Sequence, residues 1–428
     1  MLALAPLWTA PAVAAEAVAP SFDRAVRDEI AERAPKELRG VYAARGNRPL
    51  WLGQPAADLL LEQLRSAALD VAKPKKLKPG DLAKALDRAE SGDPEAAAKA
   101  EIAASLSFVR YVQAMRQAPR APMIYESQAV APVVPTAAAT LAAAAAAPSL
   151  DDYVRTMGWM HPFYAPLRSA LSREGYGGAQ RRQLALNLDR VRALPSFASG
   201  RFLLIDAASA RLWMYDGGRA VDSMKVVVGK RETQTPAMAG FVRHAIVNPY
   251  WNLPDDLMPS RVTDKVLAEG PGYLARHRLQ VLASWDAGAP VLDPRKLDWR
   301  AVKAGTRTIR ARQLPGGENF MGRVKFEFPN PQGIYLHDTP ERDLLAAPAR
   351  QFSNGCVRLE DAGRLYRWLL GKPLPPPSKA AEQQVALPEV VPIYITYFTA
   401  LPENGRIAFR PDVYGRDGAK GSAALRAR

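Results

Sequence analysis

The residues of this sequence with the clearest capacity for chemistry are a solitary cysteine and a histidine upstream of it. Cys356 is the only cysteine among 428 residues, so an internal disulfide is excluded. It is therefore either a buried packing residue or a reactive thiol. A reactive thiol needs a base that removes its proton, and His337 is the nearest histidine along the chain. Together they have the chemistry of a nucleophile and its base in acyl transfer.

The neighbours of Cys356 favour its ionised form. Gly355 allows the backbone to turn tightly beside the thiol, and Arg358 adds a positive charge. The apolar spacing after Arg358 is typical of a helix that ends near Gly371 and Pro373. This pattern predicts that the thiol lies just before a helix N-terminus, where amide groups stabilise a thiolate and an oxyanion.

The histidine lies in a segment that alternates like a strand. In GIYLHDT, Ile334 and Leu336 are expected to face a core, while Tyr335 and His337 share the opposite, exposed face. The stretch GRVKFEFPN alternates in the same way. The sequence therefore predicts that His337 stands at the end of a strand with its ring directed away from the core.

The chain divides into a helical first half and a β-rich second half, an α+β class. Residues 22–195 carry apolar side chains at helical spacing, interrupted by a proline-rich linker at 118–136. Residues 200–417 contain short alternating runs and a DGG turn, which predict a β-rich domain. Residues 254–312 mix helical and charged stretches, so we expect a capping insertion that acts as a lid. A disordered tail is expected at 418–428.

Composition indicates the cellular compartment and the classes of binding partner that we expect. Residues 1–20 are apolar and end in small residues, which predicts a signal peptide. The usual positive start is missing, so the alternatives are a start that lies upstream and a plain apolar tail. A lone thiol in an oxidising compartment favours a chemical role. The net charge of +15 favours an acidic partner. There is no basic helix or nucleic-acid motif, so we expect no nucleic-acid binding. The histidines lack metal-ligand spacing, and we expect no metal and no cofactor.

A family resemblance joins these observations. GIYLHDT, the residues 338–352 and SNGCVR together resemble the YkuD-type L,D-transpeptidase motif, H-x(14–17)-[ST]-x-G-C. The stretches VYAARGNRPLWL, NPYWNLP and GRIAFRPDVYG are similar to the large periplasmic L,D-transpeptidases that bear a scaffold domain. The resemblance covers about residues 24–417. It implies an N-terminal α-helical scaffold domain followed by a β-rich YkuD-like catalytic domain with a capping insertion.

The resemblance also implies roles for individual residues. Cys356 would be the nucleophile and His337 the general base and acid. The backbone carbonyl of Asp338 would orient His337, with the Asp338 carboxylate as a rival orienter. The amides of Gly355 and Cys356 would bind the oxyanion. The substrate-binding residues would be Tyr335, Ser353, Asn354 and Arg358.

The implied activity is the formation of 3→3 cross-links in peptidoglycan through a cysteine thioester. Tetrapeptide stems would be donor and acceptor in the periplasm, with peripheral contact to wall-synthesis proteins. The alternatives are an L,D-carboxypeptidase or endopeptidase on the same scaffold, a non-catalytic periplasmic scaffold protein, and a redox-sensing thiol. Two residues depart from the family pattern: many members carry histidine at the position of Asn354 and asparagine at that of Arg358. Residues 119–160 are too short for an added peptidoglycan-binding helical domain.

Overall fold

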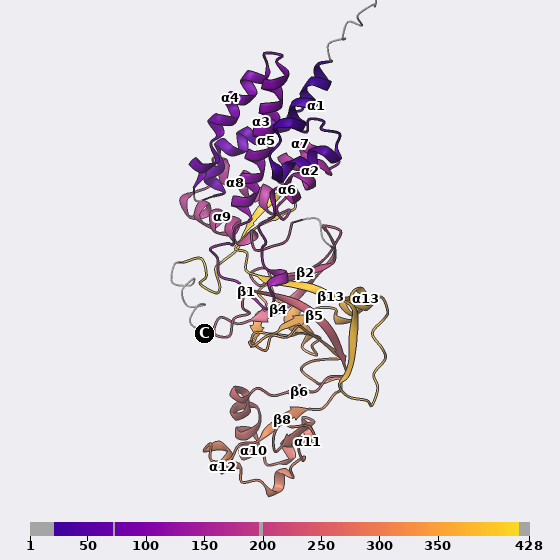
Figure 1. Ribbon diagram of the computed structural model, residues 1–428. Helices are drawn as coiled ribbons and strands as arrows, with labels where there is room; N and C mark the ends of the chain where they lie inside the picture. The colour runs from indigo at the N-terminus through magenta and orange to yellow at the C-terminus, as the bar shows by residue number, and fades with distance from the viewer. Residues whose placement is uncertain (1–20, 72, 197–199, 419–428) are drawn as a thin grey trace, which may run out of the picture. The chain divides into compact units, whose positions relative to one another are not determined.

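The computed structural model describes residues 21–71, 73–196 and 200–418, and the chain divides into two compact units (Figure 1). The predicted signal peptide lies outside the described residues, as does all but the first residue of the predicted tail. The α+β class is confirmed, because a helical N-terminal region is followed by a β-rich domain. No helix in the described ranges has the length and apolar character needed to cross a membrane.

The first unit comprises the described residues up to Met115 together with Val134–Arg155, and it is helical. Its helices are α1 (Phe22–Arg33), α2 (Lys36–Ala44), α3 (Ala56–Arg65), α4 (Pro79–Ala89), α5 (Pro94–Met115), α6 (Ala137–Ala145) and α7 (Leu150–Arg155), with 3₁₀ turns at Ala67–Leu69 and Pro74–Leu77. Glu101 of α5 is fully buried in this unit, and its carboxylate accepts hydrogen bonds from the amides of Leu50 and Trp51 and from the Tyr42 hydroxyl. One carboxylate therefore ties the turn after α2 to the central helix.

The second unit is built on a ten-stranded sheet that closes into a ring. Its strands are β1 (Ile124–Tyr125), β2 (Phe202–Asp206), β3 (Arg211–Asp216), β4 (Arg219–Gly229), β5 (Met238–Val247), β9 (Val324–Glu327), β10 (Leu336–His337), β11 (Gln351–Ser353), β12 (Val357–Leu359) and β13 (Gln383–Thr396). The order is β1-β5-β13-β2-β3-β4-β12-β10-β9, and β11 pairs with β4. The ring closes because β9 also pairs with β5.

Alternating side chains fill the inside of this ring. The predicted meander is confirmed as β2, β3 and β4, and two left-handed glycines, Gly217 and Gly218, form the turn between the last two. The predicted inward residues Leu336 and Phe326 are fully buried and level with each other on paired strands. One helix, α13 (Ala362–Leu370), packs its apolar face into the same core.

The capping insertion has a core of its own. It contains β6 (Trp251–Asn252), β7 (Leu279–Leu282) and β8 (Arg310–Gln313), the helices α10 (Asp264–Glu269), α11 (Gly272–Arg276) and α12 (Trp299–Lys303), and short turns at Asp255–Leu257, Pro259–Thr263 and Pro294–Lys296. Its strands form a separate three-stranded sheet in the order β6-β8-β7. Trp251, Trp299 and Val262 belong to its hydrophobic cluster. These elements run from Trp251 to Gln313, around the predicted 254–312 segment, where strand pattern gives way to helix pattern.

The structure differs from the sequence-based boundaries at two places. The 118–136 linker contains β1, an edge strand parallel to β5, and a 3₁₀ turn at Gln128–Val130. Residues 156–195 include α8 (Tyr164–Ser172) and α9 (Gly178–Val191), which belong to the second unit and not to the helical one. Helical periodicity identifies a helix but not its packing partner.

The partner of these helices is the chain's final hairpin. That hairpin consists of β14 (Ala400–Glu403) and β15 (Arg406–Phe409). Gln183 of α9 donates to the Thr399 carbonyl, and Arg190 forms an ion pair with Asp417. α9 is therefore bonded to the residues on either side of this hairpin.

Candidate active site

Four of the predicted site residues occupy one face of two neighbouring strands. β10 and β12 run parallel, with Leu336 level with Val357 and His337 level with Arg358. The Val357 amide donates to the Tyr335 carbonyl at 2.9 Å, which continues this register backwards. Because side chains alternate along a strand, Tyr335 and His337 share a face with Cys356 and Arg358. The nucleophile and base candidates therefore lie diagonally across adjacent strands.

The loop that carries Cys356 is a tight turn held by Ser353. Gly355 has a φ of +119°, a backbone conformation that side-chain-bearing residues rarely adopt. The Ser353 hydroxyl accepts from the Gly355 amide at 3.1 Å and donates to the Cys356 carbonyl at 2.6 Å. Asn354, at the tip, is exposed. The Gly355 amide, an expected oxyanion donor, is thus engaged by Ser353, which leaves the Cys356 amide for that role.

The predicted helix after the thiol begins later than expected. The strand β12 follows Cys356 directly, and α13 starts at Ala362 with Asp361 as its N-cap. Its predicted end is confirmed, because Gly371 is left-handed after the last turn. The alternation of buried Val357 and Leu359 favours a strand over a helix here. The thiol therefore does not lie at a helix N-terminus, and the helix dipole does not stabilise its anion.

His337 is buried, whereas the strand pattern predicted an exposed position. Its side chain is 4% exposed, and its Nδ1 atom lies 2.6 Å from the backbone oxygen of Asp338. A proton on Nδ1 in this contact leaves Nε2 unprotonated and able to accept one. The Asp338 carboxylate is engaged elsewhere, by the Arg323 amide and the Arg342 guanidinium.

The electrostatic setting keeps both reacting groups neutral at rest. Burial, reinforced by the positive charge of Arg358, lowers the pKa of His337 to about 4. Burial raises the pKa of the Cys356 thiol, against the opposing effects of the Tyr335 backbone and Arg358. A neutral imidazole on the same face as a neutral thiol can accept the thiol proton.

Three residues near the site carry no signal in the sequence alone. Glu341 forms an ion pair with Arg358. The backbone of Phe320 contacts His337, and its ring packs on Trp251 of the capping insertion. Thr235 donates a hydrogen bond to the Gly355 carbonyl. Each acts through a contact with a residue outside its own segment, which only the folded structure reveals.

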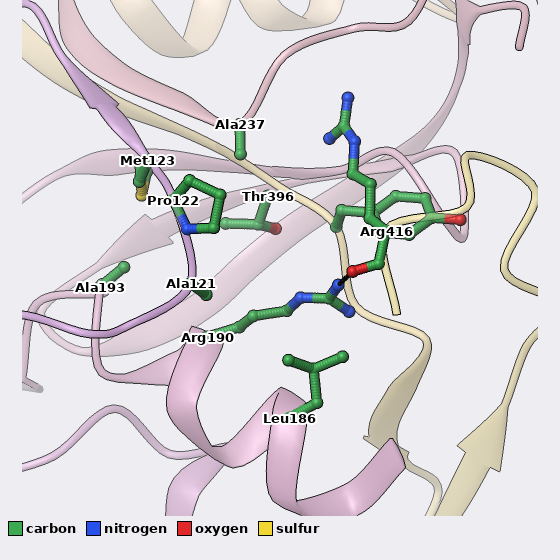
Figure 2. A pocket seen from close by; sticks show the side chains of 10 residues that line it. Ala121, Pro122, Met123, Leu186, Arg190, Ala193, Ala237, Thr396 and Arg416 are labelled. Carbon is green, nitrogen blue, oxygen red and sulfur yellow. Dashed lines mark hydrogen bonds between the residues drawn. The ribbon is translucent and has the colours of Figure 1, made fainter. Parts of the chain in front are cut away.

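One cavity of the second unit lies apart from this pair of residues. Across the described residues, no group of three His, Cys, Asp or Glu side chains could hold a metal ion. A cavity of about 40 Å³ lies between α9, the 121–123 segment, the end of β13 and Arg416 (Figure 2). Its lining includes Arg190 and Arg416 but neither Cys356 nor His337.

Comparison with known proteins decides the family. Residues 200–392 match the family model of the L,D-transpeptidase catalytic domain, YkuD, and residues 36–171 match the model of the Scaffold domain. The chain carries a YkuD-type L,D-transpeptidase catalytic domain and a scaffold domain. The YkuD match contains both Cys356 and His337, as the motif spacing predicted.

Individual relatives agree with this assignment. A protein of Haemophilus influenzae, provisionally named as an L,D-transpeptidase, is 33% identical over 242 residues, which are 55% of this chain and 48% of the relative. The chain therefore spans about half the length of that curated relative.

Solved L,D-transpeptidases match at lower identity. An enzyme of Enterococcus faecium is 11% identical, with 46% of this chain and 50% of that one covered and a TM-score of 0.24. L,D-transpeptidase 3 of Mycobacterium tuberculosis is 16% identical, with 48% and 65% covered and a TM-score of 0.23. The family assignment rests on the two domain models.

Proposed function

We propose that this protein is a peptidoglycan L,D-transpeptidase that joins stem peptides by 3→3 cross-links through a thioester on Cys356. The observation that carries the proposal is the register of β10 and β12, which puts Cys356 and His337 on one face inside the segment that matches the YkuD model. A thiol and an imidazole in this relation suit acyl transfer.

In the first half-reaction the Cys356 sulfur attacks the carbonyl that joins the third stem residue, diaminopimelate at its L-centre, to the terminal D-Ala. His337 takes the thiol proton on its unprotonated ring nitrogen. The Cys356 amide stabilises the tetrahedral oxyanion. The C–N bond then breaks, His337 returns the proton to the D-Ala amine, and a thioester remains.

In the second half-reaction a side-chain amine of another stem attacks the thioester. His337 accepts a proton from that amine, the C–S bond breaks, and the thiol recovers its proton. The product is an amide between two third-position residues. Water in place of the amine would give L,D-carboxypeptidase activity, and a closed capping insertion would favour transfer by excluding it.

The remaining site residues have supporting roles in this proposal. The Asp338 carbonyl fixes the tautomer of His337 through the 2.6 Å contact. Ser353 holds the turn, and Asn354, exposed at its tip, would meet the substrate. Arg358 and Tyr335 flank the thiol and would contact the substrate, with Arg358 attracting a stem carboxylate. The enzyme would act in the periplasm.

The test uses defined tetrapeptide muropeptides and identifies the products by mass. Cys356→Ala should abolish 3→3 dimers, and His337→Ala should slow them by at least about 100-fold. His244→Ala, which removes an imidazole from β5, is the matched control and should leave the rate unchanged. Dimer formation that survives in Cys356→Ala would exclude the proposed nucleophile. Tripeptide without dimers would assign the protein to the carboxypeptidases.

A further inference from the structure

The segment after β4 lies against the turn that carries Cys356. The Lys230 amide donates to the Ser353 carbonyl at 2.9 Å, and the Thr233 hydroxyl donates to the same oxygen at 3.2 Å. Thr235 is fully buried, and its hydroxyl donates to the Gly355 carbonyl at 2.7 Å while it accepts from the Gly229 amide at 2.9 Å. The single donor of this hydroxyl is therefore committed to the turn.

The Gly355 carbonyl and the Cys356 amide belong to one peptide unit. A trans peptide is planar, so its C=O and N–H bonds point in opposite directions. When Thr235 holds the carbonyl toward the buried side, the N–H must point away from it. Within the described part of the chain the Cys356 amide has no hydrogen-bond acceptor of its own. A donor that is both oriented and free is what an oxyanion requires.

We propose that Thr235 is a positioning residue, which aims the Cys356 amide at the oxyanion of the reaction by holding the Gly355 carbonyl. This inference rests on the proposed function, because it concerns the acyl-transfer step at Cys356. Glycine at 355 is a necessary part of the arrangement: without a Cβ it adopts a φ of +119°, and it restricts the orientation of the following peptide unit less than other residues would. The hydrogen bond from Thr235 supplies the orientation of this peptide unit that the glycine itself does not.

The segment that contains Arg416 holds Thr235 in turn. Arg416 donates through Nη2 to the Thr235 carbonyl at 2.8 Å and through Nε to the Gln234 side chain at 2.9 Å. The side-chain amide of Gln234 donates through Nε2 to the Tyr414 carbonyl at 3.0 Å. Arg190 of α9 donates to the Arg416 carbonyl at 2.9 Å, the dashed contact in Figure 2. These hydrogen bonds with residues 414–416 hold residues 234–235 against the turn that carries Cys356.

Two reagents distinguish an effect on the orientation of the Cys356 amide from an effect on the reactivity of the Cys356 thiol. With 4-nitrophenyl acetate, the Cys356 sulfur attacks the acetyl carbon, an oxyanion forms, and nitrophenolate leaves as the thioester forms. With iodoacetamide, the sulfur displaces iodide without any oxyanion. Thr235→Val in the full chain should slow acylation by at least about tenfold, since losing one oxyanion donor costs about 100-fold or more. Alkylation should stay within about twofold of the parent.

The matched control is Thr396→Val in β13. This buried threonine also donates to a backbone carbonyl, that of Ile205 at 2.9 Å, but it lies outside the catalytic turn. Both of its rates should equal those of the parent protein. Thr235→Ser keeps the hydroxyl and should restore acylation. If Thr235→Val does not fold, Arg416→Gln is the second variant, because it weakens the hydrogen bonds to Gln234 and Thr235. It should lower the rate of acylation and leave the rate of alkylation unchanged.

The outcomes are distinguishable from those of the proposed function. Equal acylation in parent and Thr235→Val, or equal loss of acylation and alkylation, would overturn the inference. Failure of the parent itself to be acylated by the ester would also overturn it, since no oriented donor would then be acting. Normal ester acylation without 3→3 dimers would instead remove only the proposed function.

Discussion

A buried, neutral His337 should keep this enzyme active in acid. The pKa of His337 is lowered from an ordinary 6.5 to about 4, first by burial and then by Arg358. At pH 5 about 90% of the imidazole would then be neutral, against about 3% for an unperturbed histidine. A base must be neutral to accept the thiol proton. The acidic limb of the pH–rate profile should therefore fall near pH 4.

The assay is the rate of Cys356 acylation by 4-nitrophenyl acetate between pH 3.5 and 8. Arg358→Gln is the perturbation, because removing a positive charge near an imidazole raises its pKa. The acidic limb of the variant should shift upward, toward the ordinary histidine value. Alkylation by iodoacetamide in the same buffers controls for direct effects on the thiol.

Two results would refute this reasoning. A parent rate that falls tenfold per pH unit from 7 to 5 would mean that a small fraction of free thiolate carries the reaction. If the acidic limb of the pH–rate profile lies at the same pH in Arg358→Gln as in the parent, the guanidinium does not affect the pKa of His337. Either result would contradict the neutral thiol–imidazole pair.

Three further predictions follow from individual contacts. Glu341→Gln releases Arg358 from its ion pair, so it should lower KM for donor stems that present a carboxylate while kcat changes less, in steady-state dimer assays. Gly355→Ala forces a side chain into a left-handed backbone 3.2 Å from Ile334 Cδ1, and calorimetry should show a destabilisation of about 1–3 kcal/mol. Glu101→Ala leaves buried amides without an acceptor, and denaturant unfolding should show a loss of about 3 kcal/mol confined to the helical unit.

The parts of the fold that follow from local pattern were predictable. The meander, the β9 alternation and the end of the last helix at Gly371 all depend on residues close in sequence. The resemblance that linked His337 to Cys356 also depends on residues close in sequence. The limits of the helical half were not predictable, because α8 and α9 have ordinary helical spacing and only their contacts with the C-terminal hairpin assign them to the second unit.

The electrostatics of the site were also beyond the sequence. Arg358 suggested a stabilised thiolate, but burial outweighs its charge at Cys356. The helix dipole was expected to help, yet β12 separates the thiol from α13. Thr235 and Glu341 contribute through contacts between segments that are distant along the chain. Such effects require knowledge of which strands are neighbours.

The capping insertion leaves and rejoins the chain at a single place. Trp251 at its start faces Gln313 at its end across the β6–β8 pair. In topological terms the insertion is one long hairpin loop, since its two ends are already neighbours. Its length and composition can therefore change without moving any strand of the ring. Exchange of this one segment offers a route, in evolution or in engineering, to new substrate preferences around an unchanged thiol and imidazole.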